Sequence, residues 1–120
     1  MSRRDVRLYL QDIVEAIYTI EEFTKDIDFQ TFCDNKMVFQ AVVRNFEIIG
    51  EATNNVYPYV EEMHYSQEVS YPAIIGMRNH LIHEYFGVIK EVVWETIEED
   101  LPKLKTEVDK LLEIYQTSDE

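Results

Sequence analysis

The chain has 120 residues, of which 46% are hydrophobic and 29% are charged, proportions that are ordinary for a globular protein. Its net charge of −13 argues against broad nonspecific binding to nucleic acid, which depends on Lys and Arg side chains that neutralise phosphates. The length fits a single domain over residues 1–120, with a frayed tail from about residue 117.

The sequence predicts a small number of long helices. Only three glycines and three prolines interrupt the chain, which favours long helices over many short strands. Ser2 and Asp5 have the spacing of a helix-capping box, and apolar residues then recur at helical spacing as far as Lys25. Residues 26–29 are the predicted connection that follows this first helix.

The next predicted helix is also long. Thr31 and Asp34 have the spacing of a second capping box, and the apolar residues after them continue to residues 57–58. We expect the helix to end there because Pro58 lacks the amide donor that a continuing helix uses. Helical periodicity then fails from residue 57 to about residue 70, which predicts one long loop.

Two more helical regions complete the chain. Pro72 suits the first turn of a third helix, and Gly87 is placed to end it in the left-handed conformation. A last region extends from Lys90 to Tyr115, with a break or kink predicted at residues 100–102 because they include a proline. The predicted fold class is all-α, an antiparallel bundle of four or five helices.

The third predicted helix carries the most chemically suggestive stretch. Asn79 and His83 lie four residues apart and therefore on one side of the helix, within reach of the long Arg78 side chain. Histidine transfers protons near neutral pH and arginine stabilises phosphoryl charge, so these three residues could act on one phosphate. The alternative interpretation is a solvated Arg78 and a hydrogen-bonded core His83.

A metal site competes for some of the same residues. His80, His83 and Glu84 lie at positions i, i+3 and i+4 of the predicted helix, and His64 lies in the preceding loop. Zinc requires three or four such ligands, but this spacing is not the His-Glu-x-x-His pattern of zinc proteases. We therefore expect no metal and no cofactor.

A second unusual stretch covers residues 44–52. Gly50 inside a strong helix costs about 1 kcal/mol relative to alanine, which close approach of another backbone would explain. Arg44, Glu47 and Glu51 form one polar stripe on the same helix. Two interpretations stay open: a surface ion pair worth about 0.2–0.5 kcal/mol, or supporting residues beside the site of Arg78.

The cellular compartment can also be inferred. Cys33 is the single cysteine and cannot form an intramolecular disulfide, and charged residues interrupt any apolar secretion signal at the N-terminus. No apolar stretch approaches the roughly 20 residues that span a bilayer. We expect a cytoplasmic protein with no membrane role.

The chain resembles the HepT-like group of the HEPN superfamily over nearly its whole length. These proteins are small helical ribonuclease toxins encoded beside MntA-type minimal nucleotidyltransferase antitoxins. The resemblance rests on residues 9–17, 44–52, 76–88, 93–96 and 100–102. Its signature, Arg-x4-His-x-Tyr, falls on Arg78, His83 and Tyr85.

The resemblance implies a metal-independent endoribonuclease, in which a 2′-hydroxyl attacks the adjacent phosphodiester and leaves a 2′,3′-cyclic phosphate. His83 would be the general base or acid, Arg78 would stabilise phosphate charge, and Asn79 would orient the phosphate or the imidazole. The resemblance also implies a homodimer with a composite cleft, and Tyr85 as the residue to which the antitoxin transfers AMP. The alternative is a non-catalytic helical module that binds a nucleotidyltransferase partner.

Overall fold

The computed structural model describes residues 2–62, 73–77 and 88–117. All regular structure within these ranges is helical, which confirms the predicted all-α class. Residues 73–77 form a short helical segment. The other elements are α1 (Arg3–Thr24), α2 (Phe29–Asp34), α3 (Lys36–Glu62), α5 (Val88–Glu95), the π-helix η1 (Thr96–Asp100) and α6 (Leu101–Thr117).

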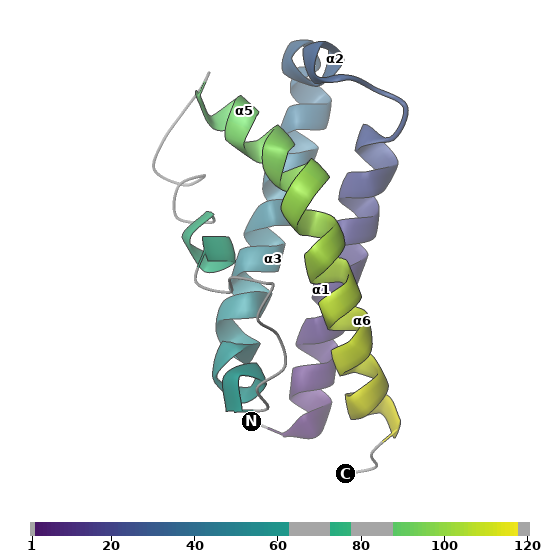
Figure 1. The fold of residues 1–120 in the computed structure, drawn as a ribbon, viewed down its shortest axis with the longest axis vertical. Coiled ribbons are helices and arrows are strands. Elements are labelled where there is room, and N and C mark those ends of the chain that lie inside the picture. Colours follow the sequence, from purple (N-terminus) through teal and green to yellow (C-terminus); the bar gives the residue numbers. More distant parts are fainter. Residues whose placement is uncertain (1, 63–72, 78–87, 118–120) are drawn as a thin grey trace.

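The three long helices lie side by side in an elongated bundle (Figure 1). Helix α1 leads away from the end where both termini lie, α2 covers the far end, and α3 returns. Helices α5 and α6 also lead back from the far end, so α1 is antiparallel to both α3 and α6. It packs against both of them, and it is therefore the central helix of the bundle.

The core is formed by one apolar stripe from each long helix. Every third or fourth residue of α1 is buried, as the helical periodicity predicts, and the same is true of α3 and α6. Burying one large aliphatic side chain contributes about 1.5–3 kcal/mol, so this core holds the bundle together. Its fully buried residues include Leu10, Ile13, Ile17, Ile20, Val42, Ile49, Val56, Leu104 and Leu111.

Helix α1 begins and ends close to where the sequence predicts. The Ser2 hydroxyl accepts a hydrogen bond from the Asp5 amide at 3.1 Å, and the Asp5 carboxylate accepts one from the Ser2 amide at 3.4 Å. Lys25 is the C-terminal cap in an extended conformation. Asp26 follows with a φ of 66°, a left-handed conformation that aspartate tolerates better than most residues.

The predicted capping box at Thr31 and Asp34 is wrong. The Asp28 carboxylate accepts a hydrogen bond from the Thr31 amide at 2.8 Å, so Asp28 is the N-cap of the separate short helix α2. The Asn35 side chain then accepts from the Val38 amide at 3.0 Å at the start of α3. Asp and Asn rank above Thr as N-caps, and their competing signals divide the predicted single helix into two.

The predicted end of the second helix at residues 57–58 is also wrong, because α3 continues through Pro58 to Glu62. Proline removes the amide that would bond to the carbonyl of Asn54, four residues earlier. Both Asn54 and Pro58 are exposed, so water can satisfy that carbonyl. Buried Val56 meanwhile holds this part of the helix against the core. The predicted third-helix boundaries, Pro72 and Gly87, lie outside the described residues.

The C-terminal region is helical over all of residues 88–117, so the break or kink predicted at 100–102 takes the form of a kink without a break (Figure 1). The helix also changes type directly before that place. Residues 96–100 form a π-turn, in which the Leu101 amide donates to the Thr96 carbonyl five residues earlier. Helices α5 and α6 lie along different directions on either side of this turn (Figure 1).

None of the described helices is both long and apolar enough to cross a bilayer.

Candidate functional site

The four residues predicted to carry the chemistry, Arg78, Asn79, His83 and Tyr85, lie outside the described residues. The two segments that flank them along the chain are described. Residues 73–77 are helical and lead directly to Arg78, and α5 begins at Val88, directly after the stretch 78–87.

The N-terminal flank is packed onto the bundle core. Ile74 and Met77 line an apolar cavity of about 20 Å³ together with residues of α3, η1 and α6. That volume is close to the smallest space that holds a single water molecule, and the lining is almost entirely apolar. The segment 73–77 is therefore fitted closely against its neighbours. The other lining residues are Phe46, Ile49, Thr96, Asp100, Leu101 and Leu104.

The C-terminal flank is held by a lysine and an aromatic cluster. The Lys90 ammonium donates a hydrogen bond to the Cys33 carbonyl at 3.1 Å and lies 5.3 Å from the centre of the Phe39 ring. Trp94, one helical turn later, lies 5.0 Å from the ring of Phe32, measured between centroids. The first two turns of α5 therefore contact both α2 and α3.

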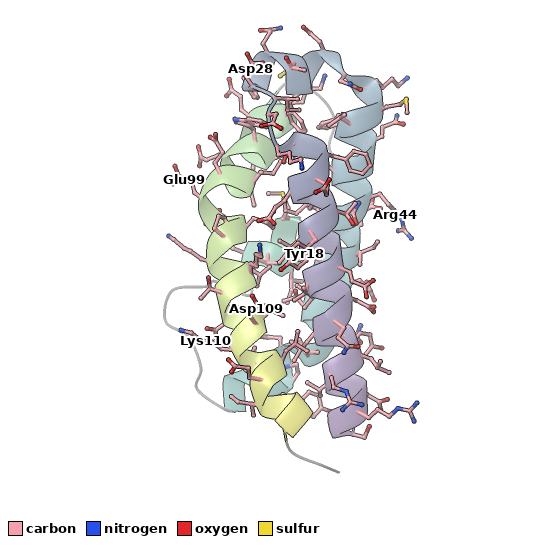
Figure 2. All side chains as sticks on the ribbon, turned by 90° about the vertical axis from the view of Figure 1, so that its right-hand side faces the viewer. Tyr18, Asp28, Arg44, Glu99, Asp109 and Lys110 are labelled. Carbon is pink, nitrogen blue, oxygen red and sulfur yellow. The ribbon has the colours of Figure 1, made fainter. Side chains whose placement is uncertain are left out.

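Two further predicted site residues, Arg44 and Glu47, are described, and they form an ion pair at 3.7 Å. The Arg44 side chain is 71% exposed and points away from the bundle (Figure 2), whereas that of Glu47 is 30% exposed. An exposed pair at this distance contributes at most about 1 kcal/mol. The guanidinium of Arg44 therefore stays accessible to a negatively charged ligand.

Arg44 and Glu47 also line a surface hollow of about 320 Å³ between α1 and α3. Ile48 and Ala52 supply its apolar lining, and Glu51 adds a further carboxylate from α3. The hollow thus combines one guanidinium with several carboxylates, which suits recognition of a polar ligand better than burial of an apolar one.

The hollow contains two residues to which the sequence analysis assigned no role. Tyr9 and Asp12 reach it from α1 and add a phenol and a carboxylate. They are three residues apart, which places them on neighbouring turns of one helix face. That spacing shows only that Tyr9 and Asp12 share a face of α1. The position of this face beside Arg44 depends on how α1 and α3 pack.

The polar stripe of Arg44, Glu47 and Glu51 has two interpretations: a surface ion pair, or supporting residues beside the site of Arg78. The ion pair expected for Arg44 and Glu47 is present, and the stripe opens toward α1. The segment 73–77 instead lies beside the buried face of α3 that carries Phe46 and Ile49. How the stripe lies relative to residues 78–87 falls outside the described ranges, so a supporting role of Arg44 and Glu47 stays a prediction.

The four residues weighed as metal ligands, His64, His80, His83 and Glu84, all lie outside the described residues. Within the described part of the chain, no three His, Cys, Asp or Glu side chains come together in a way that could hold a metal ion.

The chain matches known proteins over most of its length. The family described as "Ribonuclease HepT-like" matches residues 13–111. A protein of Methanocaldococcus jannaschii that is provisionally named an RNase is 44% identical over 91% of this chain and 98% of its own. A protein of Thermococcus cleftensis named a probable ribonuclease HepT is 46% identical over 91% of this chain and 97% of its own.

A bacterial relative agrees with the two archaeal ones. A protein of Caldanaerobacter subterraneus, also provisionally named an RNase, is 39% identical over 89% of this chain and 94% of its own. No solved structure matches the chain. The extent of the family match, together with relatives covered almost end to end, shows that the chain belongs to the HepT-like ribonuclease family.

Proposed function

We propose that this protein is a metal-independent endoribonuclease and the toxin of a toxin–antitoxin pair. The observation that carries the proposal is the family match over residues 13–111, which includes the whole Arg78-x4-His83 motif. The relatives named as ribonucleases support the same class of reaction. Since RNA is an intracellular substrate, the proposed reaction takes place in the cytoplasm.

The proposed reaction is an internal transfer within the RNA. The 2′-oxygen attacks the adjacent phosphorus, the bond from phosphorus to the 5′-oxygen breaks, and a 2′,3′-cyclic phosphate and a 5′-hydroxyl result. His83 takes the proton from the 2′-hydroxyl or delivers one to the leaving oxygen, a role worth about 10²–10⁴ in rate. Arg78 stabilises the charge that develops on the phosphoryl oxygens, and Asn79 orients the phosphate or the imidazole.

The reaction needs a base and an acid at the same time, and one imidazole cannot easily be both. A two-fold dimer supplies a second His83 from the partner copy, because an isologous contact brings the same surface of both copies together. We therefore propose that the active form is a homodimer with a composite cleft. Arg44 serves in this proposal as a supporting contact to RNA phosphate, with Glu47 as the carboxylate that orients it.

The central experiment compares the wild type with His83→Ala on a labelled single-stranded RNA oligonucleotide. Wild-type protein treated with EDTA should cleave RNA, leave cyclic phosphate ends detectable by mass spectrometry, and leave a fully 2′-O-methylated copy intact. The His83→Ala variant should lose cleavage by about 10²-fold or more while its circular dichroism is unchanged. Full activity of a cleanly purified His83→Ala protein would contradict the assignment.

We further propose that Tyr85 is the off switch. A nucleotidyltransferase partner transfers AMP from ATP to the phenolic oxygen and releases pyrophosphate, which places negative phosphate beside Arg78 and fills the cleft that RNA needs. After incubation with that partner and ATP, the intact mass of the wild type should rise by AMP increments and RNA cleavage should stop. A Tyr85→Phe protein that gains the same mass would show that another residue is modified.

The alternative is a non-catalytic helical module that binds the nucleotidyltransferase, and the acidic charge of the chain favours it, since a net charge of −13 opposes RNA. Expression of the chain alone separates the two proposals. A toxin should slow growth, and His83→Ala should relieve that effect. Equal growth of cells expressing either form, together with absent RNA cleavage in vitro, would favour the module.

A further inference from the structure

Helix α5 begins directly after the proposed catalytic stretch in the chain. Residues 78–87 carry Arg78 and His83, and α5 begins at the next residue, Val88. The first turn of α5 therefore directly adjoins, along the chain, the stretch that carries the proposed catalytic residues. What holds that turn in place therefore bears on the proposed active site.

Lys90 is the polar group that holds it. Its ammonium donates to the Cys33 carbonyl at 3.1 Å, in the last turn of α2, where helix carbonyls have no intrahelical donor. It also lies 5.3 Å from the centre of the Phe39 ring on α3. One side chain therefore joins α5 to α2 and α3, two contacts that an uncharged side chain of similar length could not both make.

The aromatic cluster next to Lys90 gives this contact a rigid surface. Phe32 is fully buried and lies 5.6 Å from Phe39 and 5.0 Å from Trp94, measured between ring centroids. Trp94 also lies 6.1 Å from Phe29. These rings come from α2, α3 and α5 and pack against one another. The Phe39 ring that Lys90 contacts is therefore fixed in place, and Lys90 can hold α5 at a defined position relative to it.

We propose that Lys90 is a positioning residue for the ribonuclease site, which it serves by fixing the start of α5 relative to α2 and α3. This inference rests on the proposed function. Catalytic rate depends steeply on placement, and a displacement of about 1 Å can cost about 10²-fold. The segment before the catalytic stretch packs onto the core through Ile74 and Met77, and Lys90 makes the polar contact in the segment after it.

The chain offers a matched control for Lys90. Lys105 also joins two helices through a hydrogen bond and an aromatic ring, although its acceptor is charged: its ammonium lies 3.0 Å from the Glu21 carboxylate and 4.4 Å from the centre of the Tyr18 ring. It joins α6 to α1 and does not adjoin residues 78–87 in the chain. Replacing either lysine with methionine removes comparable contacts, but only one replacement acts next to the catalytic stretch.

The experiment measures kcat, KM and Tm for wild type, Lys90→Met and Lys105→Met on the labelled single-stranded RNA oligonucleotide. In Lys90→Met we expect kcat to fall about 10- to 100-fold with KM within about threefold, whereas Lys105→Met should keep kcat within about twofold at a similar loss of Tm. Lys90→Arg keeps the charge and the donor, so it should recover most of the wild-type kcat.

Several outcomes would overturn the positioning role. Unchanged kcat in Lys90→Met would do so, as would equal losses of kcat in both methionine variants. If circular dichroism shows that Lys90→Met does not fold, Lys90→Gln, which keeps a donor without the charge, takes its place in the same comparison. A wild type that does not cleave RNA would sink the proposed function together with this inference, whereas an active wild type isolates the role of Lys90.

Discussion

Protonation and helix formation are directly linked at Asp28. Its carboxylate caps α2 by accepting the Thr31 amide at 2.8 Å. Hydrogen bonds from Thr31, first from its backbone amide and then from its side chain, hold the pKa of Asp28 below its usual value of 3.8. The folded protein therefore binds this proton less readily than the unfolded chain, and the ionised carboxylate stabilises the fold.

The sign of this effect predicts a pH dependence. The contribution of Asp28 is fully present above about pH 3.8, the pKa expected in the unfolded chain, and it is lost as pH falls through the lowered pKa of the folded state. Asp28→Asn keeps a capping oxygen but cannot titrate, so its Tm should fall less steeply below that pH than the wild-type Tm. Thermal melts followed by circular dichroism at several acidic pH values measure the difference.

A second variant separates titration from capping at this position. Asp28→Ala removes the acceptor altogether and should lower Tm at every pH, including neutral pH. Identical pH profiles for the wild type and Asp28→Asn would show that ionisation of Asp28 does not contribute.

Residues whose roles depend on neighbours along the chain were predictable, and those that depend on packing were not. Ser2 with Asp5 and Arg44 with Glu47 follow from spacing alone, and both pairs are present. The caps at Asp28 and Asn35 also form through local hydrogen bonds, and the predicted capping box at Thr31 and Asp34 missed both. Tyr9 and Asp12 reach the hollow beside Arg44 only because α1 packs antiparallel to α3, which spacing within one helix does not specify.

The π-helix η1 affects the directions in which the buried side chains on either side of it point. Val93 and Leu101 are both buried, although they lie eight residues apart. A regular α-helix would place these two positions about 80° apart around its axis, near opposite edges of one buried stripe. A π-turn accommodates one extra residue, which brings the two side chains closer to the same direction.

We therefore predict that one residue of η1 can be deleted at little cost. Removing exposed Glu98 leaves the same two positions seven residues apart, within about 20° of two regular α-helical turns. The shortened helix should keep Val93 and Leu101 in the core, and Tm should change by only a few degrees, roughly the effect of 1 kcal/mol. Thermal melts of the two purified proteins test this.

A deletion in regular α-helix provides the comparison. Removing exposed Lys110 from α6 rotates the following residues by about 100° and carries Leu111 and Tyr115 off the buried face. That variant should lose several kcal/mol of stability, because two large apolar side chains leave the core. Equal destabilisation by the two deletions would mean that η1 does not absorb an extra residue.

At the scale of elements, periodicity predicted the stripes but not how helices end or continue. The apolar positions of α1, α3 and α6 were correctly assigned to the core. The loss of an amide donor at Pro58 predicts a helix end, yet the affected turn is exposed to water and the helix continues. Pro102 marked the right place for an irregularity, but its form as a π-turn depends on the register between Val93 and Leu101.

Over the whole molecule, acidic groups outnumber basic ones by 24 to 11, which is unusual for a protein that is proposed to act on RNA. The hollow beside Arg44 repeats this imbalance, since the carboxylates of Asp12, Glu47 and Glu51 line it together with one guanidinium. A net negative protein repels a polyanion at long range, while local contacts from Arg78 and Arg44 attract it at short range. The two effects respond differently to salt.

Salt should therefore change RNA cleavage in the direction opposite to that of a basic nuclease. Raising ionic strength from about 10 mM to about 150 mM shortens the screening length from about 30 Å to about 8 Å, which suppresses repulsion between distant charges more than close contacts. We predict that kcat/KM on the RNA oligonucleotide rises over this range. Replacing exposed Glu98 and Glu99 with glutamine removes two negative charges and should raise kcat/KM mainly at low salt. A steep fall of wild-type kcat/KM with salt would instead indicate that several Lys or Arg contacts to phosphate dominate binding.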